Sequence, residues 1–166
     1  MNNFLKKIKD NYLTYIILVA LLIACIVLGV FLYRKNKEYT ISVENQYNFA
    51  FYELINYVQN VENYLAKSII SSTPENGAET LTNAWREANL AQVYLSQLPS
   101  SNTEFTNAAK FLNQVSEYCY SLSRKNINNE SLTQEDLDNL KELHEYAKEL
   151  KNVLNQLSLD MRWWKN

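Results

Sequence analysis

The uncharged run between Tyr12 and Tyr33, LTYIILVALLIACIVLGVFL, constrains the fold of this chain more than any other feature. An α-helix rises ~1.5 Å per residue, so a helix of this length spans the ~30 Å hydrocarbon core of a bilayer. Tyrosine rings prefer the headgroup layer, and Tyr12, Tyr15 and Tyr33 lie near the ends of the run. The sequence therefore predicts a transmembrane anchor over residues 12–33.

Two other interpretations of this run are less favoured. A cleaved signal peptide needs a shorter apolar core followed by a small-x-small site, whereas this run ends in VFLYRK. The tetrapeptide Leu22-Ile23-Ala24-Cys25 has the form of a bacterial lipid-attachment motif, but Ile-Val-Leu follows the cysteine where small polar residues are usual. We therefore expect an uncleaved helix in which Cys25 is an inert membrane cysteine.

Charge divides the chain into a basic beginning and an acidic remainder. Three lysines precede the run and three basic residues follow it, so the positive-inside rule favours neither orientation. Residues 1–38 hold six basic and two acidic residues, a net of +4, and the whole chain carries −2, which leaves −6 on the rest. No basic stripe remains there to neutralise phosphates, so we expect no binding to nucleic acid.

The scarcity of helix breakers predicts an all-α fold. Beyond the anchor they are Pro74, Gly77 and Pro99, so four long helices are expected. We expect a short basic segment over residues 1–11, the anchor over 12–33, a stalk over 34–43 and a helical bundle domain over 44–166. Nothing between Tyr33 and Ser71 forces a break, so one helix of about 60 residues, on the order of 90 Å long, is predicted to run through the stalk.

Apolar residues at spacings of three and four predict the buried face of each helix. The predicted stripes are Tyr47, Phe51, Leu54, Val58, Val61, Leu65 and Ile69 in the first; Leu81, Trp85, Ala88 and Leu95 in the second; Phe105, Ala108, Leu112, Val115, Cys119 and Leu122 in the third; and Leu137, Leu140, Leu143, Ala147, Leu150, Leu154, Leu157, Met161 and Trp164 in the last. These stripes are apolar throughout, with no acid on a core position.

Capping signals mark the helix ends. Thr73 is suited to be an N-cap with Pro74 at the first helical position, and Pro99 is expected to stop the second helix. Residues 101–104, Ser-Asn-Thr-Glu, have the form of a capping box, and so do Thr133 and Asp136. Leu132 and Leu137 are placed as a hydrophobic staple at that second box.

Short connections between long helices favour antiparallel neighbours, and we predict an up-down-up-down four-helix bundle. In that topology the last helix returns toward the start of the first. Met161 and Trp164 should then lie near Val43 and Tyr47, and any further domain would leave the bundle close to the bilayer.

Catalytic chemistry is not expected. His144 is the single histidine, and Cys119 lies in a predicted helix, so neither a zinc site nor a disulfide framework is indicated. The acids Glu135, Asp136, Asp138, Glu142 and Glu145 are expected on a solvated face, where carboxylates also favour a helix N-terminus. Glycine-rich phosphate loops and nucleophile elbows are absent from the sequence, so we predict no enzyme, no cofactor and no metal.

Surplus aromatic residues are the remaining feature. Phe49 and Tyr52 point away from the apolar stripe of the first bundle helix. Such rings fit boundary packing, a membrane-proximal belt or a partner-binding face, and we take Phe49 and Tyr52 as candidate partner contacts.

Several short segments occur in a characteristic order from Glu44 to Trp164. They are ENQY at 44–47, FAFYEL at 49–54, WREA at 85–88, QLP at 97–99, KFLNQV at 110–115, YCYSL at 118–122, Leu132-Thr133 and Leu143-His144. Together with the preceding anchor, this order resembles the N-terminal domain of the YpeB family of spore germination proteins.

This resemblance implies a non-enzymatic partner of the spore cortex-lytic enzyme SleB, a lytic transglycosylase, each protein depending on the other in the dormant spore. It implies a single-pass protein of the inner spore membrane with its soluble domain on the cortex side. Family members continue into PepSY-type domains, so this chain looks like the anchor and N-terminal module. The family offers no catalytic residue to transfer, and the matched Trp85, Arg86, Gln97 and Pro99 fit a role in the fold.

Two other functional classes stay open on the residues alone. A membrane-anchored helical sensor or adaptor predicts a polar pocket between helices. A peptidoglycan-active enzyme predicts a buried Glu or Asp in a groove.

Overall fold

The computed structural model describes residues 2–71, 73–99 and 103–159, and helices joined by short connections are the regular secondary structure in these ranges. Side chains are described from Tyr12 onward within these ranges, apart from Leu13, Thr103 and Glu104. The helices are α1 (Asn2–Ile69), α2 (Pro74–Leu95), α3 (Thr103–Ile127) and α4 (Gln134–Leu159). The prediction of an all-α chain with a long apolar N-terminal helix is confirmed.

The chain divides into two compact units, Met1–Asn45 and Gln46–Asn166. The first unit consists of the N-terminal part of α1, whose most apolar window has a mean hydropathy of 3.2 and is not buried by any other part of the protein. Its leucine, isoleucine and valine side chains are all exposed from Ile16 to Leu32. A helix with this length and composition is suited to cross a membrane, which supports the predicted anchor. The stalk and its length stay predictions.

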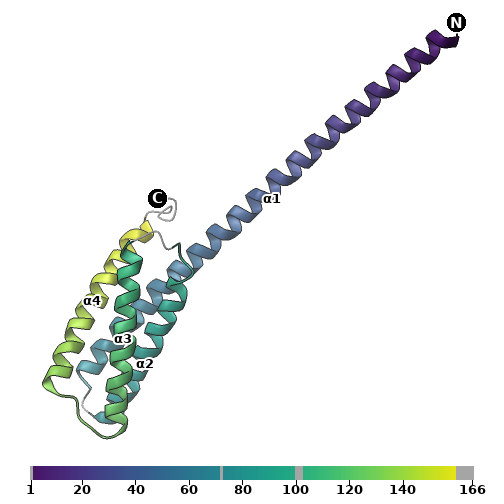
Figure 1. Cartoon of the computed structure of the whole chain (residues 1–166). Helices are drawn as coiled ribbons and strands as arrows, with labels where there is room; N and C mark the ends of the chain where they lie inside the picture. The colour runs from purple at the N-terminus through teal and green to yellow at the C-terminus, as the bar shows by residue number, and fades with distance from the viewer. Residues whose placement is uncertain (1, 72, 100–102, 160–166) are drawn as a thin grey trace. The chain divides into compact units, whose positions relative to one another are not determined.

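The second unit contains the C-terminal part of α1 beside α2, α3 and α4 (Figure 1). Side-chain contacts give the direction of each neighbour: Asn60 meets Glu87 and Ser68 meets Thr80 between α1 and α2. Residue numbers rise along one helix as they fall along the other, so the two helices are antiparallel.

The same pattern holds for the later pairs. Asn89 bonds Ser116 and Trp85 meets Tyr120 between α2 and α3, while Tyr118 bonds Asn139 and Phe111 meets Tyr146 between α3 and α4. Lys151 of α4 pairs with Glu62 of α1. Three successive antiparallel pairs are what an up-down-up-down bundle requires. The predicted neighbours Met161 and Trp164 lie outside the described residues.

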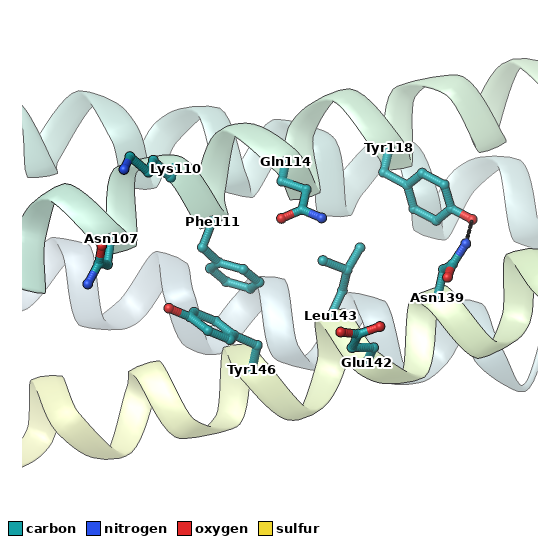
Figure 2. Close-up of a pocket in the computed structure, with 9 residues that line it drawn as sticks. All are labelled: Asn107, Lys110, Phe111, Gln114, Tyr118, Asn139, Glu142, Leu143 and Tyr146. Atoms are coloured by element: carbon teal, nitrogen blue, oxygen red, sulfur yellow. Dashed lines mark hydrogen bonds between the residues drawn. The ribbon is translucent and has the colours of Figure 1, made fainter.

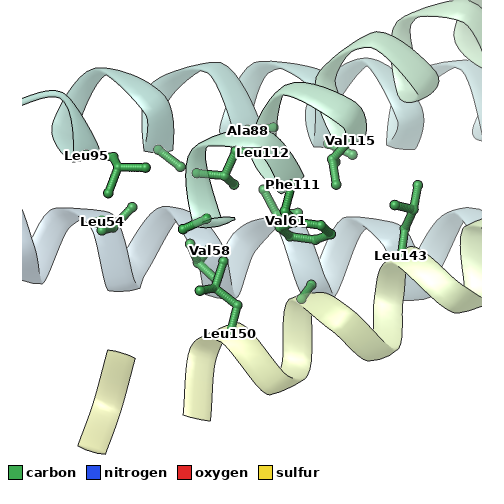
Figure 3. Close-up of a cluster of buried hydrophobic side chains, with 14 of the residues drawn as sticks. Leu54, Val58, Val61, Ala88, Leu95, Phe111, Leu112, Val115, Leu143 and Leu150 are labelled. Atoms are coloured by element: carbon green, nitrogen blue, oxygen red, sulfur yellow. The ribbon is translucent and has the colours of Figure 1, made fainter. Parts of the chain in front are cut away.

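The core lies where the four helices face one another, and side chains from all four meet there (Figure 3). The predicted stripe of α3 is buried from Phe105 to Leu122, and Phe51, Leu54, Val58, Val61 and Leu65 of α1 are buried as well. In α4 the residues Leu140, Leu143, Ala147, Leu150 and Leu154 are buried, whereas Leu157 packs against the core only in part. Burial of this apolar surface is the main source of the domain's stability.

The predicted face of α2 is wrong at Trp85, which is 37% exposed and packs on Tyr120 at a ring-centroid distance of 5.6 Å. Three alanines, Ala84, Ala88 and Ala91, fill the buried face between Leu81 and Leu95. Such small side chains let the neighbouring helices come close, and an indole ring would not fit between them.

The expectation of purely apolar core faces is also wrong. Glu87 is buried to 6% exposure, and Ser68, Ser116, Ser123 and Asn126 are buried with it. Glu87 lies beside the alanine face of α2, where Asn60 of α1 donates a hydrogen bond to its carboxylate. A buried polar group is tolerated where a partner replaces its water.

Helix ends follow the predicted caps in part. The Thr73 hydroxyl accepts a hydrogen bond from the Asn76 N–H, with Pro74 starting α2. Thr133 and Asp136 exchange the two bonds of a capping box, at 2.9 and 3.1 Å. The helix α2 ends at Leu95, so Pro99 lies beyond the stop. Leu132 and Leu137 are both half-buried, as a staple needs, and the predicted box at Ser101 lies outside the described residues.

Candidate functional site

Phe49 and Tyr52, the predicted partner contacts, are both exposed on α1, at 59% and 57%. The Phe49 ring lies edge-on to Tyr94 of α2 at 6.0 Å, whereas the Tyr52 ring meets its neighbour Phe51 at 6.5 Å. Both rings therefore keep more than half of their surface available to another molecule. Their role in binding stays a prediction.

A row of rings beside Phe49 was not anticipated. Tyr57 stacks on Tyr94 at a centroid distance of 5.3 Å with an interplanar angle of 14°. Burial raises the pKa of the Tyr57 hydroxyl, and the nearby Tyr94, Glu53 and Glu87 raise it further. The row joins α1 to α2 through ring contacts, and its signal in the sequence, a tyrosine on the flank of each stripe, is visible only once the two helices are paired.

The buried carboxylate of Glu87 does not have the surroundings of a catalytic acid. One oxygen accepts a bond from Asn60 at 2.9 Å and the other faces the Arg86 guanidinium at 3.2 Å. A general acid needs an apolar pocket and access to a substrate, whereas here a side-chain amide and a guanidinium contact the carboxylate.

Asp136 is largely buried, which corrects its place on the solvated face. Its carboxylate accepts bonds from Thr133 N–H and from the Lys125 ammonium at 2.8 Å, and the Tyr118 hydroxyl lies 3.4 Å away. Burial raises the pKa of Asp136, but the hydrogen bonds from Lys125 and Thr133 outweigh it and hold the pKa below its usual value. The group therefore serves helix α4 as a charged cap.

The other acids of this cluster and His144 offer no chemical centre. Glu135, Asp138, Glu142 and Glu145 are exposed as predicted. His144 is partly covered and lies 3.5 Å from Glu145. Among the described residues, no group of three or more His, Cys, Asp or Glu side chains could hold a metal ion.

A hollow of about 410 Å³ lies between α3 and α4 (Figure 2). Lys110, Gln114 and Tyr118 reach it from α3, and Asn139, Glu142 and Tyr146 from α4. These residues flank the two apolar stripes, so they meet only after the helices pair. For that reason the hollow was not predicted from the sequence. The sequence feature that indicates it is the repetition of amide and tyrosine side chains beside the two apolar stripes.

The hollow is fixed at both of its ends by contacts between the two helices. The Asn139 amide donates to the Tyr118 hydroxyl at 3.1 Å at one end. Phe111 and Tyr146 pack ring against ring at 4.5 Å toward the other. The arrangement can bind a small polar molecule, since mixed apolar and polar linings of this volume are typical of ligand sites.

Residues 35–163 match the protein family described as YpeB N-terminal. The sporulation protein YpeB of Halalkalibacterium halodurans is 29% identical over 135 residues, covering 78% of this chain and 30% of that protein. The sporulation protein YpeB of Bacillus subtilis is 24% identical over 156 residues, covering 89% of this chain and 35% of that protein.

The chain thus spans about a third of the length of the curated relatives that it matches. No solved structure matches it. The family match covers more than half of the chain and includes α2, α3 and the described part of α4. The chain therefore belongs to the YpeB family of sporulation proteins, by its N-terminal domain.

Proposed function

We propose that this chain is a non-enzymatic, membrane-anchored germination protein that binds, localises and stabilises a cortex-lytic enzyme of the SleB type. The observation that carries the proposal is its membership of the YpeB family over residues 35–163. In this proposal the bundle lies on the cortex side of the inner spore membrane. The enzyme then acts on cortex peptidoglycan while this chain supplies no chemistry.

Tethering gives such a protein a physical role without catalysis. An enzyme held by an anchored partner is confined near its wall substrate, and confinement raises its effective concentration without any new contact to that substrate. The candidate anchor of residues 12–33 supports this role, since the leucine, isoleucine and valine side chains from Ile16 to Leu32 are exposed along the helix.

The partner surface is proposed to centre on Phe49 and Tyr52. Both rings are more than half exposed on one helix, three residues apart. Aromatic residues dominate the binding energy of many protein interfaces, and the loss of one such anchor costs upward of about 2 kcal/mol.

The first prediction tests this function in purified dormant spores of a strain that lacks the gene. We expect the lytic enzyme to be depleted and cortex breakdown on germination to fail, because an untethered enzyme is not retained. The intact gene should restore the enzyme level and cortex breakdown. A gene that carries both Phe49→Ala and Tyr52→Ala should restore neither of them. The matched control is Tyr120→Ala, which removes an exposed ring on the α2/α3 side. Normal enzyme levels and normal cortex breakdown in the deletion strain would overturn the proposal.

A second function, that of a membrane-anchored helical sensor or adaptor, is favoured by one observation. Such a protein needs a polar pocket between helices, and the hollow between α3 and α4 has polar side chains from both. A strain with the enzyme at normal level but with a delayed response to germination conditions would favour this second function.

A further inference from the structure

Several polar side chains that line the hollow between α3 and α4 have no hydrogen-bond partner within the described part of the protein. Asn107, Lys110, Gln114 and Glu142 line it, and no hydrogen bond joins any of these side chains to the described part of the protein. Two amides offer donors and acceptors together, the ammonium donates and the carboxylate accepts. Figure 2 shows Gln114 of α3 and Glu142 of α4 on opposite sides of this space, with Asn107 and Lys110 farther along α3.

An aromatic surface lies in the same hollow. Tyr146 is 42% exposed, and Phe111 supports its ring at 4.5 Å with a tilt of 34°. Phe111 itself is 5% exposed, so packing holds it in place and Tyr146 presents the accessible surface. A supported ring of this kind is a rigid platform for an apolar face.

The hollow continues along the helix pair. Asn107 and Tyr146 also line a second space of about 180 Å³, together with Leu150 and Val153. On α4 the two spaces run from Asn139 to Val153, about 20 Å at ~1.5 Å per residue. An elongated ligand fits this shape better than a compact one.

We propose that this groove binds a saccharide chain, with Tyr146 under the C–H face of one ring and the amides of Asn107 and Gln114 on its hydroxyl groups. A hydroxyl both donates and accepts, and so does a side-chain amide, so the two pair without a net charge. The inference rests on the groove alone and does not depend on enzyme binding.

Other ligand classes fit less well. The apolar face of a partner helix would bury Asn107, Gln114 and Glu142 without hydrogen-bond partners, which is unfavourable for every polar group left unpaired. A phosphorylated ligand would meet one cation, Lys110, with the Glu142 carboxylate in the same hollow. Glu149 lines the second space as well, so the groove has two carboxylates against one ammonium and favours a neutral, hydroxyl-rich molecule over an anion.

The test titrates chitotetraose and cellotetraose into the full chain, held in micelles of a detergent without a sugar headgroup. Calorimetry and ligand-observed NMR should show saturable binding of at least one tetrasaccharide. Tyr146→Ala and Gln114→Met should each weaken it by roughly tenfold or more, because they remove the platform and an amide. The controls Tyr120→Ala and Gln59→Met change the same residue types at exposed positions away from the groove and should bind as the wild type does.

Far-ultraviolet circular dichroism and melting of each variant separate loss of binding from loss of fold. Saturable binding that the groove variants lose while they stay folded supports the proposal. No binding of any tetrasaccharide to the folded wild type overturns it, as does binding that the groove variants leave unchanged. Binding of an unstructured peptide in preference to every saccharide also overturns it, in favour of a peptide groove. A protein that binds no saccharide yet still retains the lytic enzyme in spores would leave the proposed function intact.

Discussion

At the scale of single residues, Gly77 shows how closely the helices approach. A Cβ atom built there would lie 2.2 Å from Nδ2 of Asn126, whose side chain is buried at 4% exposure. The sequence shows Gly77 as a potential helix breaker, but in the structure it lies in the first turns of α2. The glycine is needed for space at the contact with α3.

The second prediction concerns this contact. Gly77→Ala should destabilise the domain by roughly 1–3 kcal/mol, since a crowded core must shift to admit the methyl group. In an Asn126→Ala background the same change should become neutral or stabilising by up to about 1 kcal/mol, because alanine is the better helix former. Chemical denaturation of the four proteins measures the coupling, and an equal effect of Gly77→Ala in both backgrounds would contradict the contact.

Asp136 gives the third prediction, a pH dependence. Its pKa lies below the usual value when folded, so it adds stability above the unfolded pKa of about 3.8 and loses that stability as pH falls through the folded pKa. Asp136→Asn should therefore lower the melting temperature at pH 7, and the gap to the wild type should close in strong acid.

Lys125→Met is the matched test of the same pair, since it removes the ammonium and keeps much of the side-chain volume. The double variant should lose less stability than the two single losses added together, because the two groups share one interaction. Additive losses, or a gap that persists at pH 2, would show that Asp136 acts by packing and not by charge.

At the scale of helices, regular stripes were the most informative part of the sequence. The stripes of α1 and α3 predicted their buried faces closely, since a three-four repeat of large apolar residues permits one orientation. The buried face of α2 was harder to predict because it consists largely of alanines. The large apolar side chain of Trp85 fitted the three-four repeat and was therefore placed on that face. Glu87 also fell outside any apolar repeat, and its burial depends on Asn60, which lies 27 positions earlier.

The fourth prediction concerns the core of α3. Leu112 is fully buried, so Leu112→Ala should destabilise the domain by about 2–5 kcal/mol through lost transfer energy and a cavity. Val93→Ala is the control, since Val93 is 53% exposed on α2, and should change stability by no more than about 0.5 kcal/mol.

Cys119 offers a second readout of the same variant. Burial raises the pKa of its thiol to about 12, so in the folded domain the group stays protonated and covered. A thiol reagent should label it only when the domain opens, and Leu112→Ala should speed the labelling. An unchanged melting temperature and an unchanged labelling rate would show that Leu112 does not contribute to the stability of the core.

At the scale of the whole molecule, most of the fold could be predicted from the amino-acid composition and from the positions of the apolar run and the helix breakers. The uncharged run indicated a membrane anchor, and the scarcity of glycine and proline indicated four helices. The groove between α3 and α4 could not be predicted in this way, since its polar residues lie on the flanks of two stripes. Which flanks face one another depends on how far each helix is rotated about its axis, a property of the packed domain.

The pair of Glu62 and Lys151 links residues 89 positions apart and joins the first helix to the last. During synthesis α1, α2 and α3 can begin to pair as each emerges, because their contacts lie closer in sequence. The fourth side of the core, including Phe111 and Leu112, stays uncovered until α4 has left the ribosome. A nascent chain paused before Lys151 would therefore expose the inward apolar face of α3, the kind of surface that chaperones protect during translation.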